Sequence, residues 1–185
     1  MTLEFIKNID MQVLLLIQQY TKSPFLDLIM PFITHLADIG FIWIAIDIFF
    51  LIRKKYRYIG IRLALALILC LVVGSLILKP LIARQRPFSF YDQVTLLIPT
   101  PLDFSFPSGH TMASFAAATI IFKYLHKTGI FAFILALLIA FSRLYLFVHF
   151  PSDVLAGLIL GVFIAYISIW ICNKSSKSDK HRKNV

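Results

Sequence analysis

Apolar segments separated by short polar stretches repeat along most of the chain. Four of them approach the length of about 20 residues with which an α-helix crosses a bilayer, at about 59–78, 109–124, 129–148 and 152–172. Two shorter apolar segments lie at about 24–36 and 39–52. The pattern predicts an all-α integral membrane protein, with about six transmembrane helices in a single bundle.

The N-terminal run, residues 3–20, differs because polar side chains interrupt it, namely Glu4, Lys7, Asp10, Gln18 and Gln19. Such a run suits a helix that lies in the membrane interface or is partly buried. Ser23 and Pro24 then form a helix start, with Ser23 as N-cap and Pro24 in the first helical position. Residues 3–36 are compatible with one span, two helices, or an interfacial helix and a short span. No segment has the basic leader and cleavage site of a signal peptide.

The composition agrees with a membrane protein, since 59% of the 185 residues are hydrophobic and the mean hydropathy is +0.85. The net charge is +9 and the pI about 9.7. In a soluble protein this charge would indicate nucleic acid, but here the cations flank spans, so we expect no nucleic-acid partner. We expect one membrane-embedded domain at 1–173 and a disordered basic tail at 174–185.

Most cations fall into three clusters that an alternating topology places on one face. They are Arg53, Lys54, Lys55 and Arg57 in one loop, Lys123 and Lys127 two spans later, and five cations of the tail. The positive-inside rule makes this face, and with it the C-terminus, cytoplasmic. Four other cations then lie on the outer face: Lys79, Arg84, Arg86 and Arg143. Orientation does not require cations there, so we expect them to bind something.

Two other segments at the outer face carry reactive side chains. In SFPSGHT, Ser108 is placed to N-cap the next span, with Gly109 and His110 in its first turn. A helix N-terminus has free N–H groups and a positive dipole end, which bind anions. In SRLYLFVHFPSD, His149 precedes Asp153 by four residues, close enough for the carboxylate to orient the imidazole. Cations and a helix N-terminus indicate a phosphate site, and two histidines with a carboxylate indicate proton transfer or nucleophilic chemistry.

Each of these features also has a simpler structural explanation. The cations of residues 79–86 could reach for lipid headgroups, and the P-S-G-H segment could be only a helix cap. Arg143 could form a structural bridge with Asp153, and either histidine could be a hydrogen-bonded structural residue. Because these explanations would have to coincide at three junctions on one face, the functional interpretation is favoured.

The three motifs resemble those of the type 2 phosphatidic acid phosphatase family. Residues 79–87 fit K-x6-R-P, residues 107–110 are P-S-G-H, and residues 142–153 fit S-R-x5-H-x3-D, in this order. The family includes membrane lipid phosphatases and the related vanadium haloperoxidases. The small size and high hydrophobicity are similar to those of bacterial members that dephosphorylate phosphatidylglycerol phosphate or undecaprenyl diphosphate.

The resemblance implies a role for each matched residue. His149 would be the nucleophile that forms a phosphohistidine, and Asp153 would hold its other ring nitrogen. His110 would donate a proton to the leaving group and then activate water. The substrate phosphate would be bound by Lys79, Arg86, Ser108, Gly109 and Arg143. Arg84 is outside the motif, and we expect it to contact a headgroup or to support the site from behind.

The resemblance therefore implies a metal-independent phosphoric monoester or diphosphate hydrolase of the bacterial inner membrane, with its active site at the outer membrane–water interface, facing the periplasm or exterior. Three cations and a helix terminus can replace Mg²⁺ in phosphoryl transfer, so we expect no metal and no cofactor. Asp92, Asp103 and Asp153 lack the spacing of a metal cluster. The expected partners are a phosphorylated lipid and the bilayer, without an obligate protein partner.

Other functions stay open from the sequence. The motif residues recognise the phosphate and not the lipid, so undecaprenyl diphosphate, phosphatidylglycerol phosphate, phosphatidic acid and lipid A phosphates all qualify; an outer-face site favours the first. A lipid phosphotransferase would use a lipid acceptor in place of water. A non-enzymatic alternative is an anionic-lipid carrier or transporter, although internal repeats and broken helices are not evident.

The loop at residues 88–106 is unusually apolar for a solvent-facing segment. One hypothesis is that Leu96, Leu97 and Ile98 dip into the membrane interface and gate lipid entry. The alternative is that the loop packs on its own protein.

Overall fold

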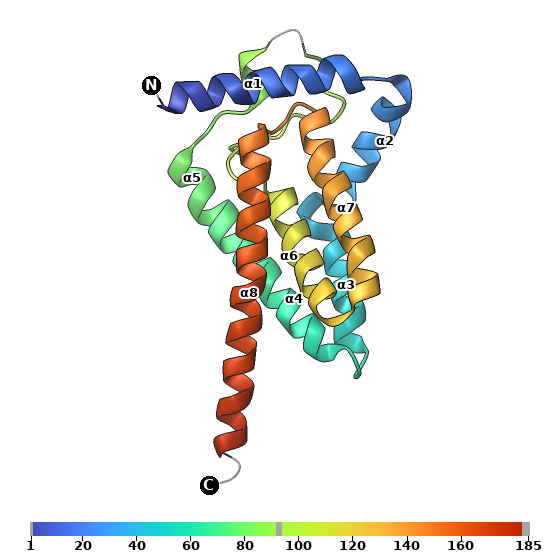
Figure 1. The fold of residues 1–185 in the computed structure, drawn as a ribbon, viewed down its shortest axis with the longest axis vertical. Helices are drawn as coiled ribbons and strands as arrows, with labels where there is room; N and C mark the ends of the chain where they lie inside the picture. Colours follow the sequence, from blue (N-terminus) through green and yellow to red (C-terminus); the bar gives the residue numbers. More distant parts are fainter. Residues whose placement is uncertain (1, 92–93, 183–185) are drawn as a thin grey trace.

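The computed structural model describes residues 2–91 and 94–182, and every regular element within them is a helix. Figure 1 shows a bundle with α1 (Thr2–Thr21) lying across one end and α8 (Pro151–Arg182) running along its length. Between them come α2 (Pro24–His35), η1 (Asp38–Gly40), α3 (Phe41–Ile52), α4 (Arg57–Cys70), η2 (Leu71–Leu78), α5 (Lys79–Ile82), η3 (Pro87–Phe90), α6 (Gly109–Tyr124) and α7 (His126–Tyr145). The predicted all-helical membrane fold is confirmed.

The count of about six spans is not reproduced in the described residues. Three stretches are long and apolar enough to cross a membrane: Arg57–Phe90, His126–Tyr145 and Pro151–Ser175. The two predicted spans at 24–36 and 39–52 correspond to Pro24–His35 and Asp38–Ile52. These two segments are long and apolar enough to cross a membrane only as a pair, which is bent by 47°. Twelve helical residues rise only about 18 Å, so α2 and α3 are each too short to cross alone. The left-handed backbone at Ile39 (φ 55°) and Gly40 (φ 78°) makes the break between them.

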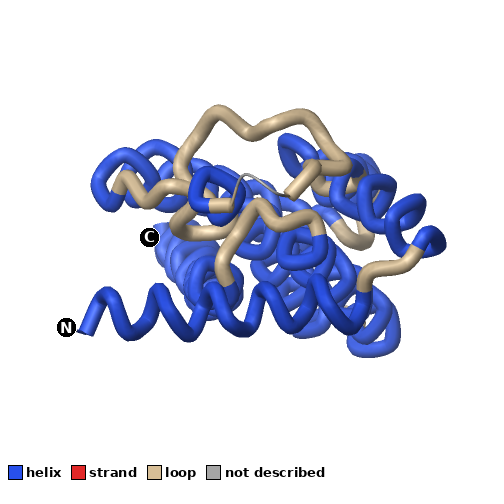
Figure 2. Tube along the Cα trace, turned by 90° about the horizontal axis from the view of Figure 1, so that it is seen from above, coloured by secondary structure: helices blue, strands red, loops and turns tan. Residues whose placement is uncertain are grey.

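The N-terminal 36 residues form two helices, one of the arrangements expected from the sequence. Seen from the α1 end (Figure 2), α1 lies flat along one edge of the bundle and the loops gather beside it. Ser23 caps α2 as predicted, since its hydroxyl accepts a hydrogen bond from the Leu26 backbone N–H at 3.3 Å, and Pro24 follows in the first turn.

The segments that carry the three predicted cation clusters lie together at the end of the bundle opposite α1, except that Lys183 of the tail is outside the described residues. The α3–α4 loop, the α6–α7 turn and the C-terminal end of α8 all point to this end (Figure 1). The last of these helices, α8, continues beyond residue 174, where the tail was expected to begin, and ends at Arg182. Extending an existing helix needs no new nucleus, and lysine is a good helix former, so the tail follows the span.

α6 lies within the bundle, and two glycines let α8 approach it closely. A Cβ on Gly161 would lie 2.3 Å from the carbonyl oxygen of Met112, and one on Gly157 would lie 2.7 Å from that of Ser108. Small residues at a four-residue spacing allow this kind of backbone contact between membrane helices. The contact holds the first turn of α8 against the N-terminus of α6, where the Ser108 N–H donates to the Asp153 carbonyl oxygen at 3.1 Å.

Candidate active site

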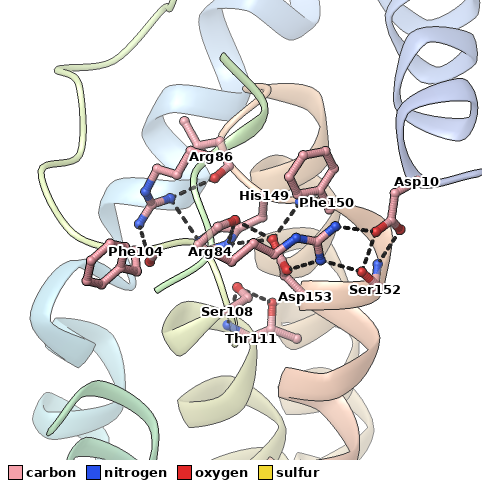
Figure 3. A network of polar contacts seen from close by, with 12 residues as sticks. Asp10, Arg84, Arg86, Phe104, Ser108, Thr111, His149, Phe150, Ser152 and Asp153 are labelled. Atoms are coloured by element: carbon pink, nitrogen blue, oxygen red, sulfur yellow. Dashed lines mark hydrogen bonds and ion pairs between the residues drawn. The ribbon is translucent and has the colours of Figure 1, made fainter. Parts of the chain in front are cut away.

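All three sequence motifs meet at the α1 end of the bundle. The first motif runs from α5 to the start of η3, the second starts α6, and the third runs from the end of α7 into the first turn of α8. Figure 3 shows Arg86, Ser108, His149 and Asp153 beside one another in this region. The loops and helix ends therefore bring together residues that are far apart in the sequence; Lys79 and Asp153 are separated by 74 positions.

His149 is buried, with 1% of its surface exposed, and its two ring nitrogens face different partners. Nε2 lies 3.2 Å from Nη1 of Arg86, and Nδ1 lies 3.6 Å from Oδ2 of Asp153. Because a guanidinium only donates, the contact with Arg86 uses the lone pair of Nε2 and places the ring proton on Nδ1. The imidazole thus has its Nε2 lone pair towards Arg86 and its N–H towards the carboxylate.

Ser105 stands between His149 and Asp153, a role that the sequence did not indicate. Its hydroxyl donates to Oδ2 of Asp153 and lies 3.5 Å from Nδ1 of His149. The Phe150 N–H also donates to Oδ2 of Asp153, at 2.8 Å. The predicted pairing of His149 with Asp153 is therefore present, but at 3.6 Å it is longer than a hydrogen bond.

The surroundings of His149 keep it neutral. Burial, followed by the positive charges of Arg86, Arg143 and Lys79, lowers the pKa of His149 well below its ordinary value of 6.5. A neutral imidazole carries the lone pair that a nucleophile needs.

Arg86 is the most extensively bonded cation of the site. Nη1 donates to the Val148 carbonyl oxygen at 2.7 Å, and Nε donates to the carbonyl oxygen of Asp103 at 2.8 Å. Nη2 lies 2.5 Å from Oδ1 of Asp103. These bonds fix the guanidinium beside His149, with 4% of the residue exposed.

Asp103 is a second residue that the sequence reasoning did not place in the site. Its carboxylate bonds both the Lys79 ammonium and Arg86, although 55% of its side chain is exposed. Burial alone would raise the pKa of Asp103, but the hydrogen bond and charge of Lys79, together with Arg86, lower it from 3.8 to about 2. The carboxylate of Asp103 therefore forms ion pairs with two cations of the first motif, Lys79 and Arg86.

Arg143 has spare donors. It is 3% exposed, its Nη1 donates to the Thr34 hydroxyl at 2.6 Å, and its Nε has no hydrogen-bond partner among the described residues. The structural alternative, a bridge from Arg143 to Asp153, is not formed, because Asp153 pairs with Arg84 at 2.6 Å. A buried guanidinium with an unpaired N–H has the capacity to bind an anionic ligand.

His110 lies in the first turn of α6 and bonds an acidic residue outside all three motifs. Its Nε2 is 2.8 Å from Oδ1 of Asp38, whose Oδ2 is 2.6 Å from Nδ1 of His35. Asp38 begins η1, at the break between α2 and α3. The only sequence signal for this contact is the Asp-Ile-Gly interruption between two apolar runs.

The N-terminus of α6 has the predicted form. The Ser108 hydroxyl accepts from the Thr111 N–H at 3.5 Å and contacts the Thr111 hydroxyl at 2.9 Å. A Cβ built on Gly109 would meet nothing within 4 Å. The space beside Gly109 is therefore open, which would allow an anion to approach the start of α6.

Arg84 supports the site, which agrees with one of its two expected roles. Its Nη1 donates to Oδ1 of Asp153 at 2.6 Å and to the Ser152 hydroxyl at 2.7 Å. Its Nη2 donates to Oδ2 of Asp10 at 2.7 Å. With its donors on protein groups, Arg84 does not serve mainly as a headgroup contact.

The apolar loop packs partly on its own protein. Leu96 and Ile98 pack against the buried cluster around Tyr145, Leu146 and Val148, whereas Leu97 is 39% exposed. This favours the packing alternative for Leu96 and Ile98. Of the carboxylates considered for a metal, Asp103 and Asp153 both pair with cations, and Asp92 lies outside the described residues.

Comparison with known proteins agrees with the motifs and the geometry. The model of the PAP2 superfamily matches residues 58–177. The undecaprenyl-diphosphatase of Sulfolobus acidocaldarius is 38% identical over 132 residues, which cover 71% of this chain and 64% of that protein's length.

Two solved structures are also similar. Aquifex aeolicus LpxE superimposes with a TM-score of 0.73 at 32% identity, over 85% of this chain and 93% of that one. The PAP2-type phosphatidylglycerolphosphate phosphatase of Bacillus subtilis gives a TM-score of 0.72 at 27% identity, over 91% and 87%. The chain is therefore a membrane-embedded member of the PAP2 superfamily, the phosphatase family that its three motifs predicted.

Proposed function

We propose that this protein hydrolyses a phosphate or diphosphate ester of a membrane lipid through a phosphohistidine at His149. The observation that carries the proposal is the position of Nε2 of His149, 3.2 Å from the Arg86 guanidinium, with Asp153 behind Nδ1. A phosphoryl group bound by Arg86 would lie next to a neutral, oriented nucleophile.

In the first step, the Nε2 lone pair attacks phosphorus and the bond from phosphorus to the lipid oxygen breaks. His110 gives a proton to the leaving oxygen, and the Nδ1–H of the new phosphohistidine stays directed at Asp153. In the second step, water attacks phosphorus, the P–N bond breaks and His110 takes the proton of the water. The proton taken from water replaces the one that His110 gave to the leaving oxygen, and Asp38, bonded to Nε2 of His110, would orient this ring in both steps.

The cations act on the charge that develops during transfer. Negative charge spreads over three equatorial phosphoryl oxygens, and prepositioned donors stabilise it most effectively. Lys79, Arg86 and the unpaired Nε of Arg143 supply charged donors, and at the α6 N-terminus the Ser108 hydroxyl and the Gly109 N–H add hydrogen bonds. Asp103 gives up its bonds to Lys79 and Arg86 when the phosphate arrives.

The substrate that we favour is undecaprenyl diphosphate, with phosphatidylglycerol phosphate next. The named Sulfolobus relative acts on the first, and the Bacillus subtilis structure on the second. The site lies at the end of the bundle opposite the segments that carry the three cation clusters, which supports an extracytoplasmic site by the positive-inside rule. An amphiphilic substrate would present its phosphate there while its chain stays in the bilayer.

The experiment is phosphate release by purified protein from four lipids: undecaprenyl diphosphate, phosphatidylglycerol phosphate, phosphatidic acid and a lipid A phosphate. We expect free phosphate, released fastest from undecaprenyl diphosphate, and none from His149→Ala. A newly phosphorylated lipid in place of free phosphate would identify a phosphotransferase instead. Binding of these lipids without any release would support the carrier or transporter alternative.

A further inference from the structure

Helix α1 reaches the site although it lies outside residues 58–177, the range matched by the family. Asp10 is 4% exposed, on the buried face of α1. Its Oδ2 accepts from Nη2 of Arg84 at 2.7 Å, and Nη1 of the same guanidinium donates to Oδ1 of Asp153 at 2.6 Å (Figure 3). One arginine therefore connects a carboxylate of α1 to the carboxylate behind His149.

Several contacts keep this arginine in one orientation. Asp10 also accepts from the Ser152 N–H at 2.9 Å and from the Ser152 hydroxyl, so α1 is bonded directly to the first turn of α8. The Arg84 guanidinium lies over the Phe150 ring, 4.0 Å from its centroid. Stacking on one face and bonds at both ends leave Arg84 little freedom to turn.

The apolar side of α1 covers the turn that carries His149. Leu14 is buried together with Phe147 and Phe150. Phe147 has a φ of 60°, a left-handed conformation that is costly for an aromatic residue and persists only where packing enforces it. α1 thus contacts both the backbone before His149 and, through Asp10, the ion pairs after it.

We infer that Asp10 is a positioning residue of the active site, which acts on His149 through Arg84 and Asp153. The inference rests on the proposed function. Arg84 holds Oδ1 of Asp153, which leaves Oδ2 to face Nδ1 of His149. Asp10 also balances the charge of Arg84, which would otherwise reduce the capacity of Asp153 to stabilise the imidazolium of the phosphohistidine.

The first test is a kinetic comparison of Asp10→Asn with wild type on the best lipid substrate. Asparagine keeps the volume of the side chain but removes its charge. We expect kcat to fall by about ten- to 100-fold, less than for loss of a triad carboxylate itself, while KM changes by less than about twofold. Arg84→Gln should likewise lower kcat and leave KM nearly unchanged.

The matched control separates positioning from simple docking of α1. Gln18 also anchors α1, through a 2.6 Å bond from its Nε2 to the Tyr145 carbonyl oxygen, but does not contact Arg84. Gln18→Leu should keep kcat within about twofold of wild type. In the Arg84→Gln background, Asp10→Asn should have almost no further effect, because the path from Asp10 to Asp153 is already broken.

A readout that needs no turnover completes the test. The chain has five histidines, so ¹⁵N-histidine labelling gives few signals, and His149→Gln would assign the Nδ1–H of His149. This resonance should shift in Asp10→Asn and stay in place in Gln18→Leu. If wild type releases no phosphate from any lipid, the proposed function fails, whereas the resonance still reports on Asp10.

Three results would overturn the inference. The first is an Asp10→Asn variant in which both the His149 resonance and kcat stay near their wild-type values. The second is an equal loss of kcat and of thermal stability in Asp10→Asn and Gln18→Leu. The third is a double variant of Asp10 and Arg84 in which the two losses of kcat add.

Discussion

Oδ1 of Asp103 lies 2.5 Å from Nη2 of Arg86, and the same carboxylate bonds the Lys79 ammonium. Asp103 belongs to the loop before α6, and 55% of its side chain is exposed. A loop carboxylate therefore occupies the two cations that we assign to the substrate phosphate. On the proposed function, Asp103 would compete with the substrate phosphate for both cations.

Asp103→Asn should therefore strengthen substrate binding. Removing a competing anion frees Lys79 and Arg86, and we expect KM to fall by about three- to tenfold with little change in kcat, a modest effect because the side chain is half exposed. Asp27→Asn is the matched control, since Asp27 bonds the Tyr145 hydroxyl at 2.6 Å and contacts neither cation. A rise in KM would show instead that Asp103 orients the two cations for the substrate.

The pH dependence follows from the lowered pKa of His149. Protonation removes the attacking lone pair, so kcat/KM should fall as the pH decreases through this pKa. Because burial and neighbouring cations place the pKa well below 6.5, activity should persist at pH 6, once the measured ionisation of the substrate phosphate is taken into account. An acid limb centred at or above pH 6.5 would contradict the environment described for His149.

Metal removal and vanadate test the nature of the phosphate site. Three cations and a helix N-terminus supply the charge that Mg²⁺ provides in other phosphoryl transfer enzymes, so EDTA should leave kcat unchanged. Vanadate, which mimics the five-coordinate phosphorus, should inhibit competitively. A loss of activity in EDTA that added metal restores, or full activity in millimolar vanadate, would exclude this site.

Arg143→Lys should be strongly deleterious despite the retained charge. The planar guanidinium bonds Thr34 with one nitrogen and offers a separate Nε, a geometry that an ammonium cannot reproduce. Loss of one transition-state donor predicts a decrease of about 100-fold in kcat, measured as phosphate release. Arg62→Lys, at the opposite end of the bundle, is the control and should remain active; equal activity of both variants would remove Arg143 from the site.

Two local features of the motifs were predictable from the sequence because each depends on a short spacing along the chain. His149 and Asp153 are four residues apart across a helix start, and Ser108 caps a helix, so local geometry places them. Asp10 and Asp38 were not predictable as site residues. Each reaches its partner across more than 70 residues of chain, and their contacts depend on how α1 crosses the bundle and where α2 breaks.

The exact number of spans was not predictable from hydropathy either. Hydropathy detects apolar length, but the bend at Ile39 and Gly40 depends on two backbone angles. Gly40 was a local signal for that break, whereas the left-handed Ile39 was not. Two short apolar runs therefore appeared as two spans, although α2 and α3 are long and apolar enough to cross a membrane only as a bent pair.

The most direct test of the account is to trap the phosphoryl group on the enzyme. Purified protein is mixed with ³²P-labelled undecaprenyl diphosphate, quenched in alkali, in which phosphohistidine survives, and the labelled peptide is identified. We predict label on His149, more of it in His110→Asn, because the weakly basic phosphate leaving group depends less on an acid than the attacking water depends on a base, and none in His149→Ala. Turnover without protein-bound label in wild type and in His110→Asn, or label that persists in His149→Ala, would contradict the central claim.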